Sequence, residues 1–196
     1  MTGTPLVVLD ACVLANFSLC DTLLRLAEPP RLFEPKWSDE IIRETTRTLE
    51  SKLGWPNSLT AHLEKELRAH FSEAWISGYE SLIPRMTNDE KDRHVVAAAV
   101  HGEAAIILTL NLRHFRPEHL AMWGIRAVLP QSFLIEVFRQ EQVVVMTKLE
   151  QQAADRSRSL RQLLDILNGT VPDFASLVSD AISRKENRAD SSQGGG

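Results

Sequence analysis

Short apolar runs alternate with longer amphipathic segments along the first two thirds of the chain. Four runs have the length of strands, and they lie at residues 5–9, 31–34, 105–110 and 126–129. The first and third are nearly continuous in apolar residues, as in strands that are buried on both faces of a parallel sheet. Strands that alternate with helices in this way indicate an α/β fold with a central parallel sheet.

Helices are predicted between these strands. Leucines at helical spacing predict one helix that ends before Pro29, and Ser38 is predicted to cap a second helix over 39–53. A third helix is predicted over 59–72, and residues 78–84 are predicted to be extended. These elements complete the alternation that an α/β domain requires.

The composition changes beyond residue 139. Residues 140–167 are rich in Gln, Arg, Leu and Val and predict one long or broken helix, with a C-cap at Asn168-Gly169. A final amphipathic helix carries an apolar stripe at Phe174–Ile182, a candidate dimer surface, although covering the protein's own core is the favoured interpretation. We predict an α/β domain over 1–139, a helical extension over 140–186 and a disordered tail over 187–196.

The composition is that of a globular protein in a reducing compartment. Apolar residues make up 43% of the chain and charged residues 24%, and no apolar run is as long as a membrane span. The first residues lack the basic and apolar regions of a secretory signal. Cys12 and Cys20 have no metal-ligand spacing and are expected to be core thiols. We therefore expect a cytoplasmic protein with no membrane partner.

The net charge and the motifs that the sequence lacks argue against several classes of function. The formal net charge is −4, and no block of basic residues is present, which argues against a passive nucleic-acid coat. An enzyme that approaches nucleic acid through metal ions is not excluded. The six histidines show no zinc-binding pattern, and neither a glycine-rich phosphate loop nor a serine nucleophile elbow is present.

Asp10 is the first candidate for chemistry, because it directly follows the apolar run at 5–9. The carboxyl end of a buried parallel strand is where open α/β sheets build their ligand sites. Asn111 follows the run at 105–110 in an equivalent place, although it could equally serve as a turn residue. Thr109, two residues earlier, is expected to face the same side and to be able to hold a carboxylate or a water molecule.

Asp92 is the second candidate. It begins a helix that Asn88 or Asp89 is predicted to cap, so one interpretation is a first-turn acid favoured by the helix dipole. Helical geometry places Asp92 in the middle of the apolar face that includes Val95 and Ala99, and it is therefore expected to point toward the sheet. A lone buried carboxylate costs several kcal/mol unless a partner such as a cation accompanies it, which favours a functional role.

Glu44 is the third candidate. Its position on the predicted helix over 39–53 allows two interpretations equally well. It lies at the edge of the apolar stripe of the helix over 39–53, near Ile41, and is expected to look into a cleft. It could also be an exposed acid paired with Arg47 or Thr48. Glu40 lies farther toward the polar side and is expected to meet solvent. Three acids and one amide would form an oxygen-rich site suited to Mg²⁺ or Mn²⁺ rather than zinc.

Four segments, taken in order, resemble the motifs of a PIN domain, and they are most similar to those of the bacterial VapC-type toxins. These segments are 6–14 (LVVLDACVL), 37–44 (WSDEIIRE), 92–99 (DRHVVAAA) and 107–115 (ILTLNLRHF). The resemblance covers roughly residues 5–138. Each motif alone is weak, but four motifs in this order and at this spacing are strong.

The resemblance implies a fold, an activity and partners. It implies a three-layer α/β/α sandwich around a central parallel sheet, a metal-dependent endoribonuclease that uses Mg²⁺ or Mn²⁺, an RNA substrate and a cognate antitoxin protein that blocks the active site. Asp10, Glu44 and Asp92 match the three recurrent acids of the family. Asn111 matches a fourth position, where members carry Asp or Asn. The resemblance thereby raises Glu44 above the even odds that its spacing gives.

The chain departs from the family pattern at three places. Cys12 stands where many members have Asn, so loss of a polar contact beside Asp10 is expected. His114 stands where an Asp commonly precedes the Phe, which makes the site less acidic and would weaken a second metal site. The helical extension goes beyond the usual compact domain.

Basic residues near the site motifs are candidates to hold the phosphates that flank a cleaved bond. They are Arg93, Arg113, His114 and Arg116, although an arginine on a helix surface is more often simply solvated. The competing hypothesis is a PIN-like scaffold, weakened in catalysis by the changes at Cys12 and His114, that binds RNA or protein without cutting. Retention of all three acids speaks against it. A structure-specific DNA nuclease fits less well, because no DNA-binding helical module is visible.

Overall fold

The computed structural model describes residues 3–193, except for the side chains of 185, 186 and 188–193. The chain forms two compact units, Met1–Pro130 and Gln131–Gly196. The division falls at Pro130, whereas the sequence analysis places it after Arg139. The helix that begins at Pro130 therefore belongs almost entirely to the second unit. The two units are described separately below.

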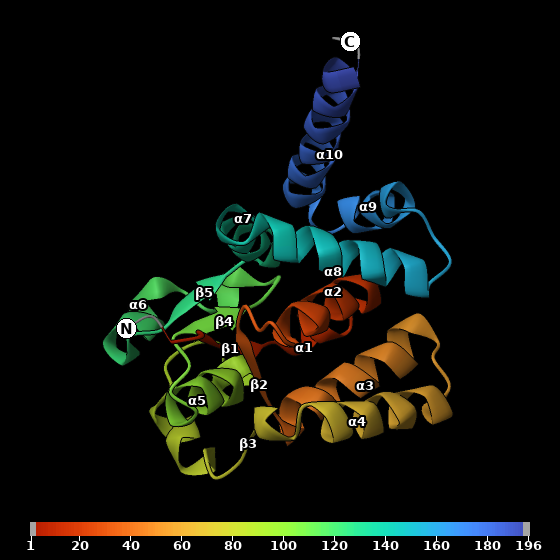
Figure 1. Cartoon of the computed structure of the whole chain (residues 1–196). Helices are drawn as coiled ribbons and strands as arrows, with labels where there is room; N and C mark the ends of the chain where they lie inside the picture. The colour runs from red at the N-terminus through yellow and green to blue at the C-terminus, as the bar shows by residue number, and fades with distance from the viewer. Residues whose placement is uncertain (1–2, 194–196) are drawn as a thin grey trace. The chain divides into compact units, whose positions relative to one another are not determined.

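A five-stranded parallel sheet forms the centre of the first unit (Figure 1). Its strands are β1 (Leu6–Leu9), β2 (Glu34–Ser38), β3 (Trp75–Ile76), β4 (Ile106–Leu108) and β5 (Arg126–Val128). They lie in the order β3-β2-β1-β4-β5, and all pairings are parallel. In this register Val7 of β1 lies between Pro35 and Ile106, so the carboxyl ends of β1 and β4 emerge side by side.

Helices cover the sheet on both sides. They are α1 (Ala11–Leu14), α2 (Phe17–Ala27), α3 (Asp39–Leu53), α4 (Asn57–His70), α5 (Arg93–His101) and α6 (Pro117–Leu120). Short 3₁₀ turns connect them, η1 (Ser72–Ala74), η2 (Glu80–Arg85), η3 (Glu90–Asp92), η4 (Leu112–His114) and η5 (Ala121–Trp123). The helix α5 packs on β1, β2 and β4, while α1 and α2 lie on the other side of β1 (Figure 1). The predicted α/β/α sandwich with a parallel sheet is confirmed.

The core of this unit follows the predicted pattern. Val7, Val8 and Leu9 are fully buried, as are Ile107 and Leu108, because both central strands have helices on each face. On α5 a continuous run from His94 to Ala99 is buried. The central strands therefore place whatever follows them at a fixed edge of a rigid sheet.

Two strands differ from the sequence-based prediction. The strand β2 begins at Glu34, so the prediction of a strand over 31–34 is wrong except for its last residue. The rest of this strand was not predicted because it contains Pro35 and Lys36, and proline and lysine are depleted in strands. The strand β3 has only two residues, too few to give a pattern, and the segment predicted to be extended over 78–84 instead forms the turn η2.

Two helices of the first unit begin where the sequence analysis places them or close by. Ser38 caps α3 by accepting a hydrogen bond from the backbone N–H of Ile41 at 3.3 Å. The helix predicted over 59–72 is α4 (Asn57–His70), which starts two residues earlier because Pro56 takes the N-cap position.

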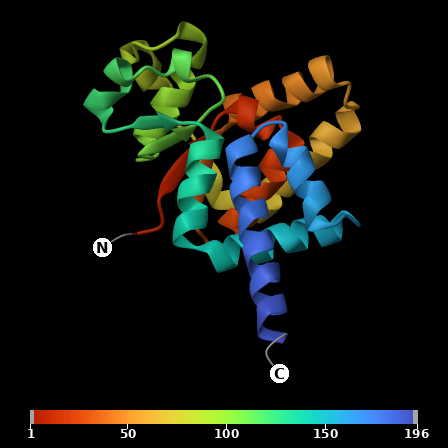
Figure 2. The ribbon, with the colours of Figure 1, turned by 90° about the horizontal axis from the view of Figure 1, so that it is seen from above.

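The second unit is helical. It contains α7 (Pro130–Gln140), α8 (Gln142–Asp155), α9 (Leu160–Asn168) and α10 (Pro172–Gln193). The stretch predicted as one long or broken helix is two helices, because Ser159 forms a capping box with Gln162 that starts α9 afresh. Gly169 ends α9 as predicted. The start of α10 lies alongside α9 (Figure 2).

The apolar stripe of α10 packs within this unit. Phe174 and Val178 are fully buried, and the Phe174 ring meets Phe138 edge-on at 6.2 Å between centroids. The stripe covers the unit's own core, and a homodimer through it stays a prediction. The helix continues to Gln193, through the first residues of the tail expected to be disordered, and residues 194–196 lie outside the described part. None of the described helices is both long enough and apolar enough to cross a bilayer.

Candidate active site

Asp10 lies between β1 and α1, at the carboxyl edge of the sheet. Its side chain is 5% exposed, and its Oδ2 accepts hydrogen bonds from the Thr109 hydroxyl at 2.7 Å and from the Cys12 thiol at 3.1 Å. Among the described residues, Oδ1 of Asp10 has no hydrogen-bond donor. One carboxylate oxygen is therefore fixed by two neutral donors, and the other is left to face the space beyond the sheet.

Thr109 and Cys12 join the ends of β1 and β4. Thr109 follows β4, is fully buried, and its hydroxyl oxygen also accepts the backbone N–H of Asn111 at 3.0 Å. The Cys12 sulfur accepts the backbone N–H of Leu110 at 3.3 Å. Burial, and then the charge of Asp10, raise the pKa of the Cys12 thiol to about 12. The thiol therefore stays protonated and donates to Asp10, so the polar contact that was expected to be lost at this position is present.

Asp92 stands at the N-cap position of α5 without capping it, since its side chain accepts no hydrogen bond from that helix. The N-cap of the preceding turn is Asp89, which accepts from the backbone N–H of Lys91 at 3.2 Å. The Asp92 carboxylate is 18% exposed and lies 2.7 Å from Nδ1 of His114. Burial raises the pKa of Asp92, and the charges of Asp10 and Asp89 add to the rise, while His114 opposes it.

Glu44 extends from α3 toward α5. Its side chain is 30% exposed, and Oε2 lies 3.3 Å from Nε2 of the buried His94. Burial disfavours a charged ring, but the contact with Glu44 outweighs it together with the other nearby acids, so the pKa of His94 is raised. Sequence reasoning missed His94, because it weighed the histidines only for zinc spacing. Glu40, one turn earlier, pairs instead with Arg43 at 2.8 Å.

Asn111 lies beside His114 and Arg113. Its amide nitrogen is 2.7 Å from Nδ1 of His114, and its Oδ1 accepts from Nε of Arg113 at 2.9 Å. Nδ1 of an imidazole either carries one proton or offers one lone pair, so it cannot donate to Asp92 and accept from Asn111 at the same time. The tautomer of the His114 ring therefore decides which of the two contacts is a hydrogen bond.

The four proposed ligands line one open pocket of about 340 Å³. We call it the acidic pocket; its lining residues are Asp10, Ala11, Cys12, Glu44, Arg47, Thr48, Ser51, Lys52, Asp92 and Asn111. The structure thus brings together all four residues that the sequence analysis proposed as ligands, from four separate segments. Their oxygen atoms are the donors that a hard divalent cation prefers.

A second group of potential ligands adjoins the acidic pocket. One ligand atom from each of Asp89, Asp92 and His114 lies within 4.8 Å of the others. Asp89 was considered in the sequence only as a helix cap, a role that it also fills. Its spacing of three residues from Asp92 was the available signal, since residues three apart lie on one side of a helical turn.

The four basic candidates separate into two pairs. Arg113 and His114 contact site residues, as described above. Arg93 instead donates to the backbone carbonyl of Asn88 at 3.4 Å, and Arg116 lies 3.7 Å from Glu118. The basic side chains that line the acidic pocket, Arg47 and Lys52, were not predicted to do so.

The spacing of polar residues along α3 could have predicted that Arg47 and Lys52 line the acidic pocket. Glu44, Arg47, Thr48, Ser51 and Lys52 are separated by three, four, seven and eight residues from the first, and they form one face of the helix. The adjoining face, which includes Ile41, Thr45 and Leu49, is buried.

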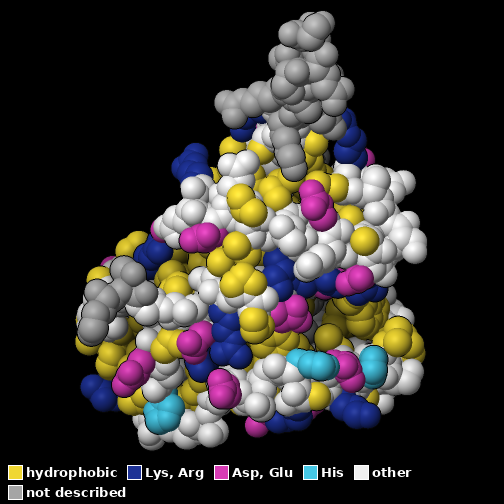
Figure 3. Space-filling model, viewed as in Figure 1, with side chains coloured by type: hydrophobic (Ala, Val, Ile, Leu, Met, Phe, Trp, Pro, Cys, Tyr) yellow, Lys and Arg dark blue, Asp and Glu magenta, His cyan; other side chains and the backbone are white. Residues whose placement is uncertain are grey.

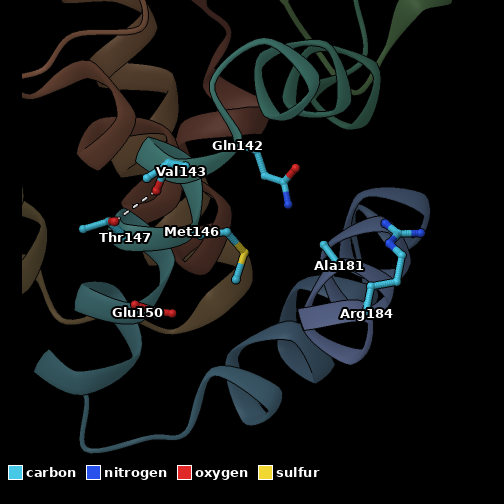
Figure 4. A pocket seen from close by; sticks show the side chains of 7 residues that line it. All are labelled: Gln142, Val143, Met146, Thr147, Glu150, Ala181 and Arg184. Atoms are coloured by element: carbon cyan, nitrogen blue, oxygen red, sulfur yellow. Dashed lines mark hydrogen bonds between the residues drawn. The ribbon is translucent and has the colours of Figure 1, made fainter. Parts of the chain in front are cut away.

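A larger pocket, of about 510 Å³, lies in the helical unit between α8 and α10 (Figure 4). Met146 of α8 faces Ala181 of α10 across it, and its charged lining residues are one acid, Glu150, and one base, Arg184. We call it the helical pocket. Carboxylates do not converge in it, so it lacks the chemistry of the acidic pocket.

Comparison with known proteins agrees with this geometry. The model of the PIN domain family matches residues 6–113, which is more than half of the chain and includes all four proposed ligands. A protein of Mycobacterium tuberculosis (strain ATCC 25618 / H37Rv), named "Putative ribonuclease VapC50", is 34% identical over 149 residues, which make up 74% of this chain and 74% of that protein. No solved structure matches the chain significantly. The chain therefore belongs to the PIN domain family.

Proposed function

We propose that this protein is a metal-dependent endoribonuclease that hydrolyses RNA phosphodiester bonds and acts as the toxin of a toxin–antitoxin pair. The observation that carries the proposal is the convergence of Asp10, Glu44, Asp92 and Asn111 on one pocket at the carboxyl edge of the sheet. The similarity to a protein named as a VapC ribonuclease supports the substrate class.

The ligand set fits Mg²⁺ or Mn²⁺. Three carboxylates and an amide offer only oxygen donors, and Oδ1 of Asp10 is directed to no donor among the described residues. The raised pKa of Asp92 reflects a carboxylate that is buried near two other acids, a situation that a bound cation would relieve. Asp10, Glu44, Asp92 and Asn111 would hold such a cation, which would supply polarisation of a phosphate and activation of the attacking water.

The three proposed acidic ligands are held by neighbours of two kinds. Thr109 and Cys12 fix Asp10 through neutral hydrogen bonds, whereas His114 holds Asp92 and His94 holds Glu44 through ionisable rings. Supporting contacts of this kind orient metal ligands and commonly change metal affinity by 10–100-fold when they are removed, so about that range is expected here.

The surrounding charge is compatible with an RNA substrate. Acidic and basic side chains are interspersed on the face shown in Figure 3, and no broad basic surface is seen on that face. An RNA strand would therefore be drawn to the site by the bound cation and by a few local bases rather than by the protein's net charge of −4. Arg113, which contacts Asn111, and His114, which contacts Asp92, are two of these bases.

A non-catalytic RNA- or protein-binding role is the second candidate, and it rests on the departures at Cys12 and His114. Both residues make contacts that suit a working site. The Cys12 thiol donates to Asp10, and His114 lies in hydrogen-bonding distance of Asp92. These contacts favour the catalytic role over the weakened one.

Metal titration with a pool of total RNA tests the catalytic proposal. We expect the purified protein to cleave RNA in Mg²⁺ or Mn²⁺, to lose this activity in EDTA, and to recover it when the metal is restored. An Asp10→Ala protein purified in parallel should be inactive. Equal cleavage by both proteins, or no cleavage in either metal, would reject the proposal.

Expression in a bacterial host tests the toxin role separately. We expect growth to stop when the wild-type chain is produced and to continue with Asp10→Ala or Asp92→Asn. The product of the neighbouring reading frame should bind the chain and restore growth if it is the antitoxin. Normal growth with an RNA-cleaving wild-type protein would reject the toxin role and leave the nuclease activity standing.

A further inference from the structure

A second hollow adjoins the acidic pocket on the side of α2 and α3. It has a volume of about 460 Å³, and Cys12, Thr48 and Lys52 line both this hollow and the acidic pocket. Its remaining walls include Phe17, Leu53 and Trp55. We call this hollow, with the six residues just named, the aromatic groove. Because Cys12 lies 3.1 Å from the Asp10 carboxylate, the groove begins immediately beside the proposed metal ligands.

The local sequence builds the aromatic groove. The helix α3 ends at Gly54, whose φ of 69° is in the left-handed region that a side chain disfavours. The chain turns back there, and the backbone N–H of Trp55 donates to the carbonyl of Leu49 at 3.0 Å. The Trp55 ring then meets that of Phe17, the first residue of α2, with centroids 5.5 Å apart and planes tilted by 56°.

The apolar part of the groove is exposed. Phe17 is 41% exposed and Leu53 is 57% exposed, while Trp55 is half-buried. Large apolar side chains that remain exposed next to a polar pocket often mark a binding surface. Aromatic faces in particular bind single-stranded nucleic acid by stacking on its bases, whatever the base identity.

Two bases lie on this surface: Lys52 lines the groove, and Arg47 lines the adjoining acidic pocket. Arg47 and Lys52 are exposed, and neither has an ion-pair partner among the residues that the structure describes. Other bases on α3 and α4 are paired, Arg43 with Glu40 at 2.8 Å and Arg68 with Asp39 at 2.8 Å. These two cations, which have no ion-pair partner among the described residues, thus line a surface where a polyanion would meet proposed metal ligands and aromatic rings together.

We propose that the aromatic groove binds one or two unstacked nucleotides next to the scissile phosphate. This inference rests on the proposed nuclease function. Phe17 and Trp55 stack on a base, and Lys52, which lines both hollows, binds the phosphate that links this nucleotide to the one in the acidic pocket. A paired base cannot enter, because its faces are covered by its neighbours in the duplex.

Binding of a labelled adenosine octamer tests the aromatic groove. The probe is a 2′-O-methyl phosphorothioate strand, chosen to resist cleavage, and its affinity is measured by fluorescence anisotropy in Mg²⁺, alone and annealed to its complement. We expect the wild type to bind the single strand more tightly than the duplex. Trp55→Leu and Phe17→Leu should each weaken single-strand binding by about tenfold. Trp55→Phe, which keeps an aromatic face, should retain most of the affinity.

The charge contribution is tested by salt dependence. Lys52→Gln should weaken binding severalfold and reduce the slope of log affinity against log salt by about 0.7, the value for one phosphate contact on a single strand. Lys65→Gln is the matched control, because Lys65 is an exposed lysine of α4 that lines neither pocket. Trp123→Leu is the control for Trp55→Leu, since Trp123 is also half-buried but lies in η5.

The outcomes separate this inference from the proposed function. If the wild type cleaves RNA while folded Trp55→Leu, Phe17→Leu and Lys52→Gln bind the octamer as the controls do, the groove assignment is overturned and the nuclease function stands. A change in oligomeric mass for the aromatic variants without a change in RNA binding would also overturn it, because the groove would then be an interface between copies. If the wild type neither binds nor cleaves RNA, the proposed function itself fails.

Discussion

The acidic pocket and the helical pocket differ in volume and in the charges of the residues that line them. The helical pocket is the larger, at about 510 Å³ against about 340 Å³, yet among the described side chains its charged lining is one acid and one base. The acidic pocket gathers Asp10, Glu44 and Asp92, whose like charges repel. A fold gains no stability from such a gathering, so the concentration of like charge, rather than volume, marks the functional site.

The contacts of each acid show how the fold tolerates three carboxylates in one pocket. Asp10 is deeply buried and is held by neutral donors, whereas Asp92 and Glu44 are more exposed and are held by histidines. Asp92 and Glu44 thus each contact an imidazole ring, and Asp10 has only hydrogen bonds from neutral groups.

Asp92→Asn should have the largest effect and should act in opposite directions on activity and stability. Loss of a proposed metal ligand should reduce RNA cleavage by more than about 100-fold. The pKa of Asp92 is raised, mainly by burial, so the folded state binds its proton more readily and stability falls as pH rises through that pKa. Removal of the charge should therefore raise the melting temperature in EDTA at neutral pH, and the gain should disappear in acid.

Differential scanning calorimetry in EDTA, with RNA cleavage measured on the same preparations, checks both halves of that prediction. An Asp92→Asn protein that is less stable than the wild type at pH 7 would show that neighbouring groups already offset the cost of burying the Asp92 charge in the metal-free fold. Full cleavage by this variant would remove Asp92 from the proposed ligand set.

Thr109→Val should have an intermediate effect. The substitution keeps the shape of the side chain and removes the hydroxyl that donates to Asp10 at 2.7 Å. Mn²⁺ affinity, measured by isothermal titration calorimetry, should fall by about 10–100-fold. Thr60→Val is a matched control, because Thr60 is equally buried and its hydroxyl also donates to a carboxylate, that of Glu50, outside the acidic pocket. Equal losses of metal affinity in both variants would contradict the role given to Thr109.

His94→Gln should have the smallest effect, and that effect should depend on pH. The pKa of His94 is raised because the contact with Glu44 outweighs burial, so its stabilising contribution is present below the ordinary histidine pKa and is lost as pH rises through the raised one. Urea unfolding should show the wild type more stable than the variant by about 1–2 kcal/mol in mild acid, with the difference shrinking at alkaline pH.

The control for that comparison is His70→Gln. His70 lies 3.4 Å from Glu66, but the pair is on the surface of α4, where such contacts contribute little. If His94→Gln and His70→Gln give the same shallow pH dependence, His94 is not a charged partner of Glu44.

The sequence predicts the part of the site that strands position. Asp10 and Asn111 were found because the apolar runs before them are long enough to identify β1 and β4, and parallel strands end at one edge. Asp92 was found because helical periodicity fixes which side of α5 faces the sheet. Glu44 needed the family resemblance, because a helix position at the margin of an apolar stripe has two equally good interpretations.

Other features depend on contacts that no local pattern carries. The pairing of His94 with Glu44 joins α5 to α3, and the bond from Cys12 to Asp10 depends on how α1 leaves β1. The unpaired state of Lys52 is visible only when its neighbours are known. In the fold, the two-residue strand β3 was missed because it is too short to show a period.

The most direct test of the central claim, that the acidic pocket cleaves RNA, is single-turnover cleavage by Asp10→Asn set against Glu150→Gln. Each substitution replaces one carboxylate with its amide, the first in the acidic pocket and the second in the helical pocket. We predict that Asp10→Asn loses more than about 100-fold in rate in saturating Mg²⁺ or Mn²⁺ while Glu150→Gln matches the wild type. Equal rates for the two variants would contradict the claim.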